Sequence, residues 1–540
     1  MTHILIFVVA GVAVVLVVEL IAERTRLPAA ALLTAAGLIY ALLPGTNIEL
    51  DPQVILTFVL PPLLYSAALN SSLLAIRKNL RPVISLSVGL VLATALLVGV
   101  GIHLFLPAIS LAAGIALGAA VAPPDPVAAL AIGRRAGLPP RLITLIEGEG
   151  LLNDATALTT FTVAVVAATT GGFSVGMFGL RFLLAAVGGL AVGMVVALFV
   201  RLVRSRVNEP VLVNSLSLIT PFAAYLFGEE IHVSGVLAVV VAGLVIGHDT
   251  PRFSSGASRL QTTAVWRLID FLLEGFVFIL IGQQLPRVLT GLGGYPTSTI
   301  VAGLGVTLGV VLLLRPIWLV VTQFLPPRLH TRLGGGERSG DGALSGREVL
   351  IMSWSGTRGV ITLAAIFSLP LVTDGGAPFP GRDVLLLCAY AVVLVTLIGQ
   401  GLTFAPIVRA TGIRADAAGE ALERNEVRTA AAHAGLARLE QLAEDQDTPD
   451  EAVRAMRAGL EHRLERYQRR ADILEGAENG EIPVSPTYEA ALTARRAIID
   501  AQRDELLRWR DAGRLTDSSL RILERELDLE EFTLPHRDGH

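Results

Sequence analysis

The chain has few charged residues and almost nothing that could cross-link it. Only 17% of the 540 residues are charged, Lys78 is the only lysine, and Cys388 is the only cysteine. A lone cysteine excludes a disulfide framework, a cysteine-based metal site and a redox pair. Soluble globular proteins carry about a quarter charged residues, whereas this chain is 53% hydrophobic with a mean hydropathy of +0.63. The composition therefore indicates a protein that lies mostly in lipid.

The charges that are present divide the chain into two regions. Residues 411–540 hold 19 arginines and 28 acidic residues, and the first 410 residues hold 24 basic and 19 acidic ones. Stretches such as "EAVRAMRAGLEHRLERYQRRADILEG" place apolar residues at helical spacing between glutamates and arginines. We therefore expect a membrane domain over residues 1–410 and a tail of soluble helices over residues 411–540, whose ligand the sequence does not identify.

Apolar windows of about twenty residues, each bounded by charge, proline or glycine, predict about thirteen membrane spans. The first window, residues 4–21, lacks a cleavage site and is expected to be a membrane helix rather than a signal peptide. The fold class expected is thus an all-α polytopic membrane protein with a helical tail. The expected spans are residues 2–22, 28–43, 52–70, 82–106, 109–131, 140–167, 177–202, 210–228, 232–248, 264–285, 296–324, 347–370 and 382–408.

Arginine is concentrated in every second loop between these spans. Loops such as "RKNLR", "GRRAGLPPR" and "RLVRSR" are rich in arginine, while "LPAIS", "TTGGFS" and "GGYPTS" contain none. Because cytoplasmic loops carry the excess of positive charge, this alternation predicts a cytoplasmic tail and an N-terminus outside. It also requires an odd number of spans, and the expected location is the cell (inner or plasma) membrane.

Two of the spans contain residues that break helices. The fifth contains "AAVAPPDPVAAL", in which three prolines remove backbone donors near mid-membrane, and the twelfth contains "SWSGTRGVITLA" with two glycines around Arg358. If the seventh span is a linker, each broken span is the fifth of its half. Interrupted helices in corresponding positions are typical of transporters built from inverted repeats. We therefore expect two inverted-topology repeats with broken crossing helices.

Four ionisable residues lie deep in the predicted spans, where a charge costs roughly 2.5–3.5 kcal/mol. They are Asp125, Glu149, Asp154 and Arg358. Such residues are tolerated when they face one another or an aqueous cavity, and we expect Arg358 to pair with one carboxylate and leave the others free to titrate. Asp125, among the prolines, is expected either to cap a half-helix or to contact a cation in the unwound segment.

The stretch "LIEGEGLLNDAT", residues 145–156, contains most of these acids. Glu149 and Asn153 are four residues apart on one helix face, and Asp154 points about 100° away from Asn153. A buried aspartate is costly when it is ionised and alone, so it holds a proton or a desolvated cation but not both. Competition for Asp154 is the minimal mechanism of an antiporter. Glu147 lies nearer the cytoplasmic end and is expected to reach water.

Several long motifs resemble the monovalent cation:proton antiporter-1 family of sodium/proton exchangers. "GEGLLNDATAL" is similar to the family signature "GESLLNDA", "APPDPVA" to "ATDPVA", and "GTRGVITLAAIFSLP" to "GxRGxxSLALAxSLP". "LPPLLYSAALN" and "HVSGVLAVVVAGLVIG" also fit the family. The resemblance covers about residues 1–410, with the motifs in the family's order, and the tail has no comparable signature.

The resemblance implies a bacterial Na⁺/H⁺ antiporter for pH and cation homeostasis, electroneutral with one cation exchanged per proton. It implies Asp154 as the residue that binds the cation and the proton, with Asn153 in support and Asp125 nearby, and a structural ion pair between Glu149 and Arg358. It further implies a homodimer in lipid with elevator-like alternating access. The transported cation is the only metal expected; no cofactor, nucleic acid or enzymatic activity is expected.

Three positions depart from the family pattern. Ser66 stands where the bacterial pattern often has an acid, Gly150 stands where it has serine, and Pro124 stands where it has threonine before the aspartate. These positions are candidate cation ligands or helpers. The alternative within the same fold is therefore a K⁺(Li⁺)/H⁺ antiporter.

Other functional classes also place acids in a membrane. A cation channel and a tail-regulated sensor are two of them, and an intramembrane aspartyl protease that uses Asp125 and Asp154 as a dyad is a third. The protease requires a GxGD-like motif, which the chain lacks. Glu274, in "FLLEGFVFIL", has no arginine close in sequence, and Arg315 is the candidate to pair with it.

Overall fold

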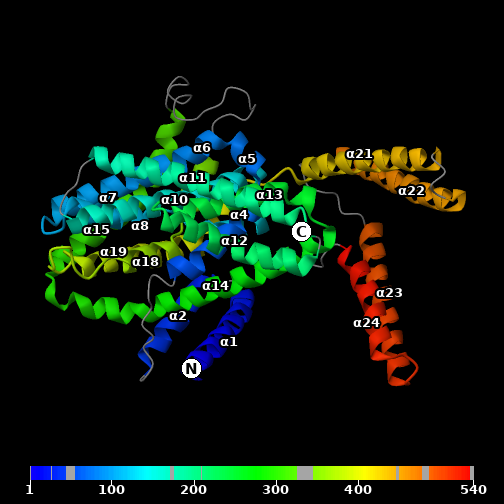
Figure 1. Cartoon of the computed structure of the whole chain (residues 1–540), viewed down its shortest axis with the longest axis horizontal. Coiled ribbons are helices and arrows are strands. Elements are labelled where there is room, and N and C mark those ends of the chain that lie inside the picture. The colour runs from blue at the N-terminus through cyan, green and yellow to red at the C-terminus, as the bar shows by residue number, and fades with distance from the viewer. Residues whose placement is uncertain are drawn as a thin grey trace. The chain divides into compact units, whose positions relative to one another are not determined.

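The computed structural model describes residues 2–25, 27–43, 55–170, 175–207, 209–324, 344–444, 449–476 and 486–534. Within these ranges the regular structure is helical, and an isolated bridge between Val372 and Pro378 is the only β pairing. The chain forms two compact units, Met1–Ile413 and Arg414–His540 (Figure 1). The all-α fold class is confirmed, and the predicted domains, residues 1–410 and 411–540, stay a prediction.

The first unit contains the apolar helices, with π-helical segments η1, η2 and η4 continuous with the α-helices that follow or precede them. Its first half comprises α1 (Thr2–Thr25), α2 (Ala29–Leu42), η1 (Ile55–Val59), α4 (Leu60–Asn70), α5 (Leu73–Lys78), α6 (Leu80–Ile84), η2 (Ser85–Leu90), α7 (Val91–Phe105), α8 (Leu111–Val121), α9 (Val127–Arg135) and α10 (Pro140–Thr170). Its second half comprises α11 (Val175–Arg204), α12 (Pro210–Glu230), α13 (Gly235–Phe253), α14 (Gly256–Thr290), η3 (Gly291–Gly294), α15 (Thr297–Phe324), α17 (Gly346–Trp354), α18 (Val360–Phe367), α19 (Arg382–Leu394), η4 (Val395–Gln400) and α20 (Gly401–Thr411).

Several of these helices are suited to cross a membrane. Among the described residues, seven are long and apolar enough: Leu80–Phe105, Pro140–Thr170, Gly179–Arg204, Pro210–Glu230, Gly235–Phe253, Thr297–Thr322 and Arg382–Thr411. Three shorter apolar helices are Ala29–Leu42, Ile55–Asn70 and Leu111–Val121. The predicted fifth and twelfth spans are not among the seven because each is interrupted. The count of thirteen spans stays a prediction.

The two interruptions lie where the sequence predicts them. Residues 122–126 separate α8 from α9, and residues 355–359 separate α17 from α18. The two breaks are hydrogen-bonded to each other: the Asp125 N–H donates to the Thr357 carbonyl at 2.6 Å, and the Thr357 hydroxyl donates to the Asp125 carbonyl at 2.9 Å. Backbone groups that leave a helix inside a membrane need such internal partners. The pairing therefore joins the two broken helices at their centres.

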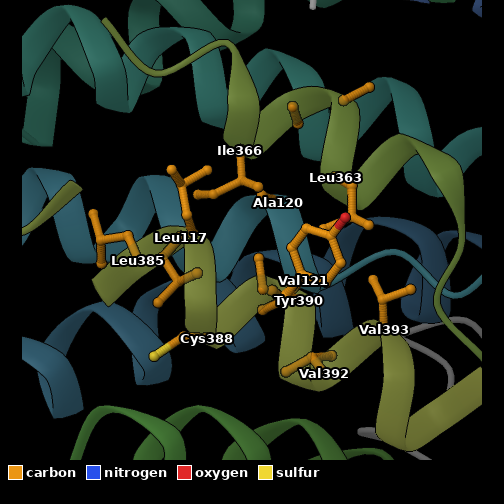
Figure 2. Packing of buried hydrophobic residues seen from close by; sticks show 14 of the residues in the cluster. Leu117, Ala120, Val121, Leu363, Ile366, Leu385, Cys388, Tyr390, Val392 and Val393 are labelled. Atoms are coloured by element: carbon orange, nitrogen blue, oxygen red, sulfur yellow. The ribbon is translucent and has the colours of Figure 1, made fainter. Parts of the chain in front are cut away.

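The half-helices are anchored by close packing against α19, as Figure 2 shows. Leu117 of α8, Leu363 and Ile366 of α18, and Cys388 and Tyr390 of α19 belong to one cluster, and none is more than 2% exposed. Lipid is about as apolar as these side chains, so dispersion and fit rather than removal from water hold such a cluster together. The packing fixes where the two breaks lie.

Glycines allow α2 and α14 to approach each other closely. A Cβ atom on Gly37 would overlap the carbonyl oxygen of Ile279, and one on Gly282 would overlap that of Thr34. Small residues let helix backbones come together in membranes, where the hydrophobic effect contributes little to helix association. The contact therefore depends on the absence of a side chain at both positions.

The second unit consists of charged helices, namely α21 (Ala417–Glu444), α22 (Asp450–Glu475), α23 (Pro486–Asp511) and α24 (Asp517–Phe532). α21 packs on α22 and α23 packs on α24 (Figure 1). The Asn425 side chain donates to the Tyr467 carbonyl at 2.7 Å, and Arg503 pairs with Asp528 and Glu531, each at 2.6 Å. Polar contacts and narrow apolar seams hold each helix pair together.

Candidate ion-binding site

The long helix α10 carries the acids and the amide that the sequence singles out. Asn153 is fully buried, Glu149 is 2% exposed and Asp154 is 6% exposed. α10 packs against α8 and against the π-helical segment η2, in which the Ser87 hydroxyl donates to the Glu149 carbonyl at 3.2 Å. These three side chains therefore lie inside the first unit, next to the breaks.

Asp154 contacts no group of opposite charge among the residues that the structure describes. Across the described part of the chain, no hydrogen-bond donor and no arginine, lysine or histidine contacts its carboxylate. The charge that acts on it is that of Asp125, which is also negative. A buried carboxylate that is ionised and unpaired is costly. Asp154 therefore needs a proton or a cation to be stable in this position.

Asn153 connects Asp154 to the first break. Its Nδ2 donates to the Pro124 carbonyl at 2.9 Å, whereas its Oδ1 is buried and accepts no hydrogen bond within the described ranges. An amide held by its nitrogen presents its oxygen as an acceptor. Asn153 thus presents one buried, uncharged acceptor oxygen next to the first break, and Pro124 contributes through its backbone rather than as a ligand side chain.

Asp125 begins the second half of the fifth span. Its Oδ1 accepts the N–H of Val127 at 3.0 Å, so the carboxylate caps α9. Its Oδ2 fills the space beside Gly359, where a Cβ atom would overlap it. Asp125 thus supports the start of the half-helix α9 and its charge acts on Asp154, while direct contact of Asp125 with a cation stays a prediction.

Glu149 is paired with Arg315 of α15, which corrects the predicted pair with Arg358. Both nitrogens of the Arg315 fork contact the carboxylate, with Nη2 at 2.9 Å from Oε2, and Arg315 also donates from Nε to the Met352 carbonyl at 2.8 Å. Arg315 and Glu149 are 3% and 2% exposed. A buried ion pair is tolerable when the arginine contacts the carboxylate with two nitrogens and its Nε–H also has an acceptor.

Arg358 does not pair with Glu149, and its guanidinium instead donates to backbone carbonyls. It donates from Nε to Val121 at 3.0 Å and from Nη2 to Ala122 at 3.3 Å, and Nη1 contacts the Gly356 carbonyl. The last carbonyls of a helix have no partner within that helix. Arg358 therefore caps the end of α8, and Thr396 of η4 accepts its backbone N–H at 2.9 Å.

A family model described as sodium/hydrogen exchanger, transmembrane, matches residues 11–410. The chain belongs to the sodium/hydrogen exchanger family. The family inferred from the motifs is confirmed, and so is cation/proton exchange as the function. The match covers the membrane unit almost entirely and stops just before the charged helices.

Relatives and solved structures agree with this family. An uncharacterized Na⁺/H⁺ exchanger of Mycobacterium bovis is 33% identical over 546 residues, covering 98% of this chain and 96% of the relative. A sodium, potassium, lithium and rubidium/H⁺ antiporter of Bacillus subtilis is 33% identical over 388 residues, covering 69% and 56%. The sodium proton antiporter of Methanocaldococcus jannaschii shares the fold, with a TM-score of 0.56 at 17% identity over 75% of this chain and 97% of that one.

In this exchanger the three departures from the family pattern have different surroundings. Pro124 accepts a hydrogen bond from Asn153. A Cβ atom on Gly150 would overlap the ring of Pro126, so the two residues pack together and no hydroxyl fits at position 150. Ser66 is buried and donates to Oδ2 of Asp270 at 2.5 Å. The structure thus brings an acid to Ser66 that the sequence reasoning missed.

Glu274 and Glu147 do not make the contacts expected from the sequence. Arg315 is used by Glu149, so the predicted pair of Arg315 with Glu274 is wrong. Glu147, expected to reach water, pairs with the exposed Arg134 of α9 and has a side chain that is 18% exposed. The sequence does contain a sign that Asp270 is functional, because this aspartate lies one helical turn before Glu274 within an apolar span, "RLIDFLLEGF".

Proposed function

We propose that Asp154 binds a proton and a monovalent cation in turn. The exchanger then moves the proton across the membrane in one direction and the cation in the opposite direction. The observation that carries this proposal is a buried carboxylate that, within the described ranges, contacts neither a hydrogen-bond donor nor a cationic side chain. A proton and a cation stabilise the same charge, so binding of one expels the other. The site therefore couples the two fluxes.

The groups around Asp154 suit a small, partly dehydrated cation. The Asn153 amide oxygen is free to accept, and Asp125 adds a second carboxylate nearby. Hard monovalent cations prefer oxygen ligands, as carboxylates, amides and unwound backbone provide in transporters with broken helices. Na⁺ is the cation proposed first, with K⁺ and Li⁺ as the alternative, in line with the printed activity of the Bacillus subtilis relative.

The charges of the centre favour electroneutral exchange of one cation for one proton. Three carboxylates and two guanidinium groups lie at or next to the breaks, namely Asp125, Glu149, Asp154, Arg315 and Arg358. Their formal charges leave one negative charge when all are ionised. One proton or one monovalent cation on Asp154 cancels it in either loaded state. A neutral centre crosses the membrane field at little electrostatic cost.

The transport cycle proposed here is elevator-like alternating access in a homodimer. The hydrogen bonds between the two breaks and the packing of α8 and α18 on α19 make these elements a single body that can move with its ion. The alternation of Arg-rich loops supports an N-terminus outside and a cytoplasmic tail in a multi-pass plasma membrane protein.

Proteoliposomes loaded with a pH-sensitive dye test the proposal. Addition of Na⁺ to wild-type vesicles with an acidic interior is expected to dissipate the pH gradient, and Asp154→Asn is expected to abolish this response. Asp249→Asn is the matched control, because Asp249 pairs with Arg201 at 3.2 Å at the end of α13, away from the breaks. Full exchange by Asp154→Asn would overturn the proposal.

A cation series in the same vesicles separates the alternatives. Na⁺, K⁺ and Li⁺ are added in turn, with choline as the impermeant control, while the membrane potential is clamped. An electroneutral exchanger responds equally with and without the clamp, and it saturates with cation concentration. A cation channel would instead need no counter-gradient, and its flux would follow the potential.

A further inference from the structure

α14 carries two acids that the mechanism above does not use. Asp270 and Glu274 are four residues apart and lie on one face of the helix. In the part of the chain that the structure describes, neither is paired with an arginine, lysine or histidine. The charges of Asp125, Asp270 and Glu19 all act on Glu274. Unpaired acids inside a membrane helix are costly and line a polar path rather than a lipid-facing surface.

Asp270 is oriented by a residue from another helix. The hydroxyl of Ser66, on α4, is 1% exposed and donates to Oδ2 of Asp270 at 2.5 Å, a length typical of a hydrogen bond to an ionised carboxylate. The second oxygen, Oδ1, is shielded from solvent and accepts no hydrogen bond within the described ranges. One oxygen is thus held in place and the other is free to contact a cation.

The surroundings keep this pair rigid. Tyr65, next to Ser66, packs its ring against Trp266, one turn before Asp270, with ring centroids 5.3 Å apart. Trp266 also donates from Nε1 to the Ser217 hydroxyl of α12 at 3.0 Å. Side chains that are locked by packing and hydrogen bonds hold functional groups more precisely than free ones. The distance between α4 and α14 is therefore fixed at Ser66 and Asp270.

The pair lies on one side of the centre. Ser66 is near the end of α4, which leads into the basic segment with Arg77, Lys78 and Arg81. Asp270 is closer than Glu274 to the start of α14, where Arg252 in the last turn of α13 and Arg259 in the first turn of α14 lie on either side of the connection. Both helices therefore bring the pair toward the Arg-rich side of the membrane, and the charges of Asp270 and Asp125 both act on Glu274.

The geometry points to Asp270, oriented by Ser66, as a residue that determines cation affinity on the Arg-rich side: its carboxylate contacts the monovalent cation before Asp154 does. This inference rests on the proposed function of Asp154. The family pattern often has an acid at position 66, where this chain has serine. In this chain Asp270 of α14 supplies a carboxylate next to the same position, through its contact with Ser66.

The test measures the KM for Na⁺ and the maximal rate of exchange in proteoliposomes for wild type, Asp270→Asn and Ser66→Ala. Asp270→Asn is expected to raise the KM about tenfold with little change in maximal rate, as expected when one contact to a charged group is lost. Ser66→Ala leaves the carboxylate in place but unoriented, and it is expected to raise the KM about threefold. Asp249→Asn is the control for loss of one acid and is expected to leave the KM unchanged.

The decisive variant moves the acid to the position where the family pattern has it. The double variant Ser66→Glu with Asp270→Asn is expected to restore the KM to within about threefold of wild type. An unchanged KM in Asp270→Asn and Ser66→Ala, or a loss of maximal rate alone, would overturn the inference. If Asp270→Asn does not fold, Ser66→Ala decides the matter by its KM. Failure of wild-type exchange, or exchange by Asp154→Asn, would instead count against the proposed function.

Discussion

Arg315 and Arg358 are equally buried, at 3% exposure each, but they interact with different kinds of group. Arg315 uses its fork on a carboxylate, while Arg358 uses its fork on helix-end carbonyls. Removing one partner of a buried ion pair leaves the other charge uncompensated, which is far more costly than losing an exposed pair. The two ion pairs of α10, one buried and one exposed, allow that difference to be measured.

We expect Glu149→Gln to destabilise the exchanger by about 3–5 kcal/mol, because Arg315 is left charged and buried. Glu147→Gln, which removes the exposed pair with Arg134, is the matched control and should cost about 0–1 kcal/mol. The measurement is thermal unfolding of the purified protein in detergent. Equal melting temperatures for the two variants would show that the Glu149–Arg315 pair does not stabilise the fold.

Gly150 answers a question that the sequence raised, because the family pattern has serine at this position. The Pro126 ring, a residue that the family pattern also has, occupies the place of its side chain, so glycine at position 150 lets this ring pack directly against α10. We expect Gly150→Ser alone to lower exchange activity and the melting temperature, since the break must shift to admit the new atoms. Gly150→Ser combined with Pro126→Ala should recover both, and a single variant that behaves like wild type would contradict this packing.

Sequence reasoning located buried charges better than it paired them. Asp125, Glu149 and Arg358 stand out because each is an isolated charge in an apolar run, and the structure places all three at the centre. Which arginine meets Glu149 depends on how helices about 166 residues apart in the chain are packed, and no local pattern encodes that. The Ser66–Asp270 contact spans 204 residues and was missed for the same reason.

The breaks are elements that the sequence predicts well. Prolines in the fifth span and glycines in the twelfth have direct conformational effects, and both interruptions lie at those residues. The π-helical segments were not predictable in this way, because an extra residue in one helical turn leaves no clear signature in apolar periodicity. Two of them nevertheless contact the centre, through Ser87 in η2 and Thr396 in η4.

The α2–α14 contact gives a prediction at the level of helix packing. We expect Gly282→Ala to lower the melting temperature and reduce exchange, because the added methyl group meets the backbone carbonyl of Thr34, which cannot move without α2. Gly309→Ala on α15 is the control: nothing lies within 4 Å of its Cβ position, and alanine favours a helix over glycine by about 1 kcal/mol. Similar melting temperatures for both variants would argue against close packing of α2 on α14.

The whole molecule separates into an exchanger unit and a charged helical unit, Met1–Ile413 and Arg414–His540. The match to the exchanger family ends at residue 410, so the transport chemistry lies within the first unit. We expect a chain truncated after Ile413 to retain Na⁺-driven proton movement in proteoliposomes, within about threefold of the full-length rate, because every contact of the site is internal to that unit. If the truncated chain elutes as a monodisperse species in size-exclusion chromatography but does not exchange ions, the tail is required for transport.

The solitary carboxylate of Asp154 also sets how tightly the protein prevents leakage. With neither ion bound, the moving centre would carry a net negative charge through the membrane, at a cost of roughly 2.5–3.5 kcal/mol on insertion scales. That penalty slows the empty return step about 100-fold relative to a loaded one. An arginine placed beside Asp154 would neutralise the empty site and remove this energetic penalty. The empty site could then cross the membrane without a second ion, and exchange would become uncoupled. In the proposed cycle, the strictness of coupling thus follows from the lack, among the described residues, of a cationic side chain beside Asp154.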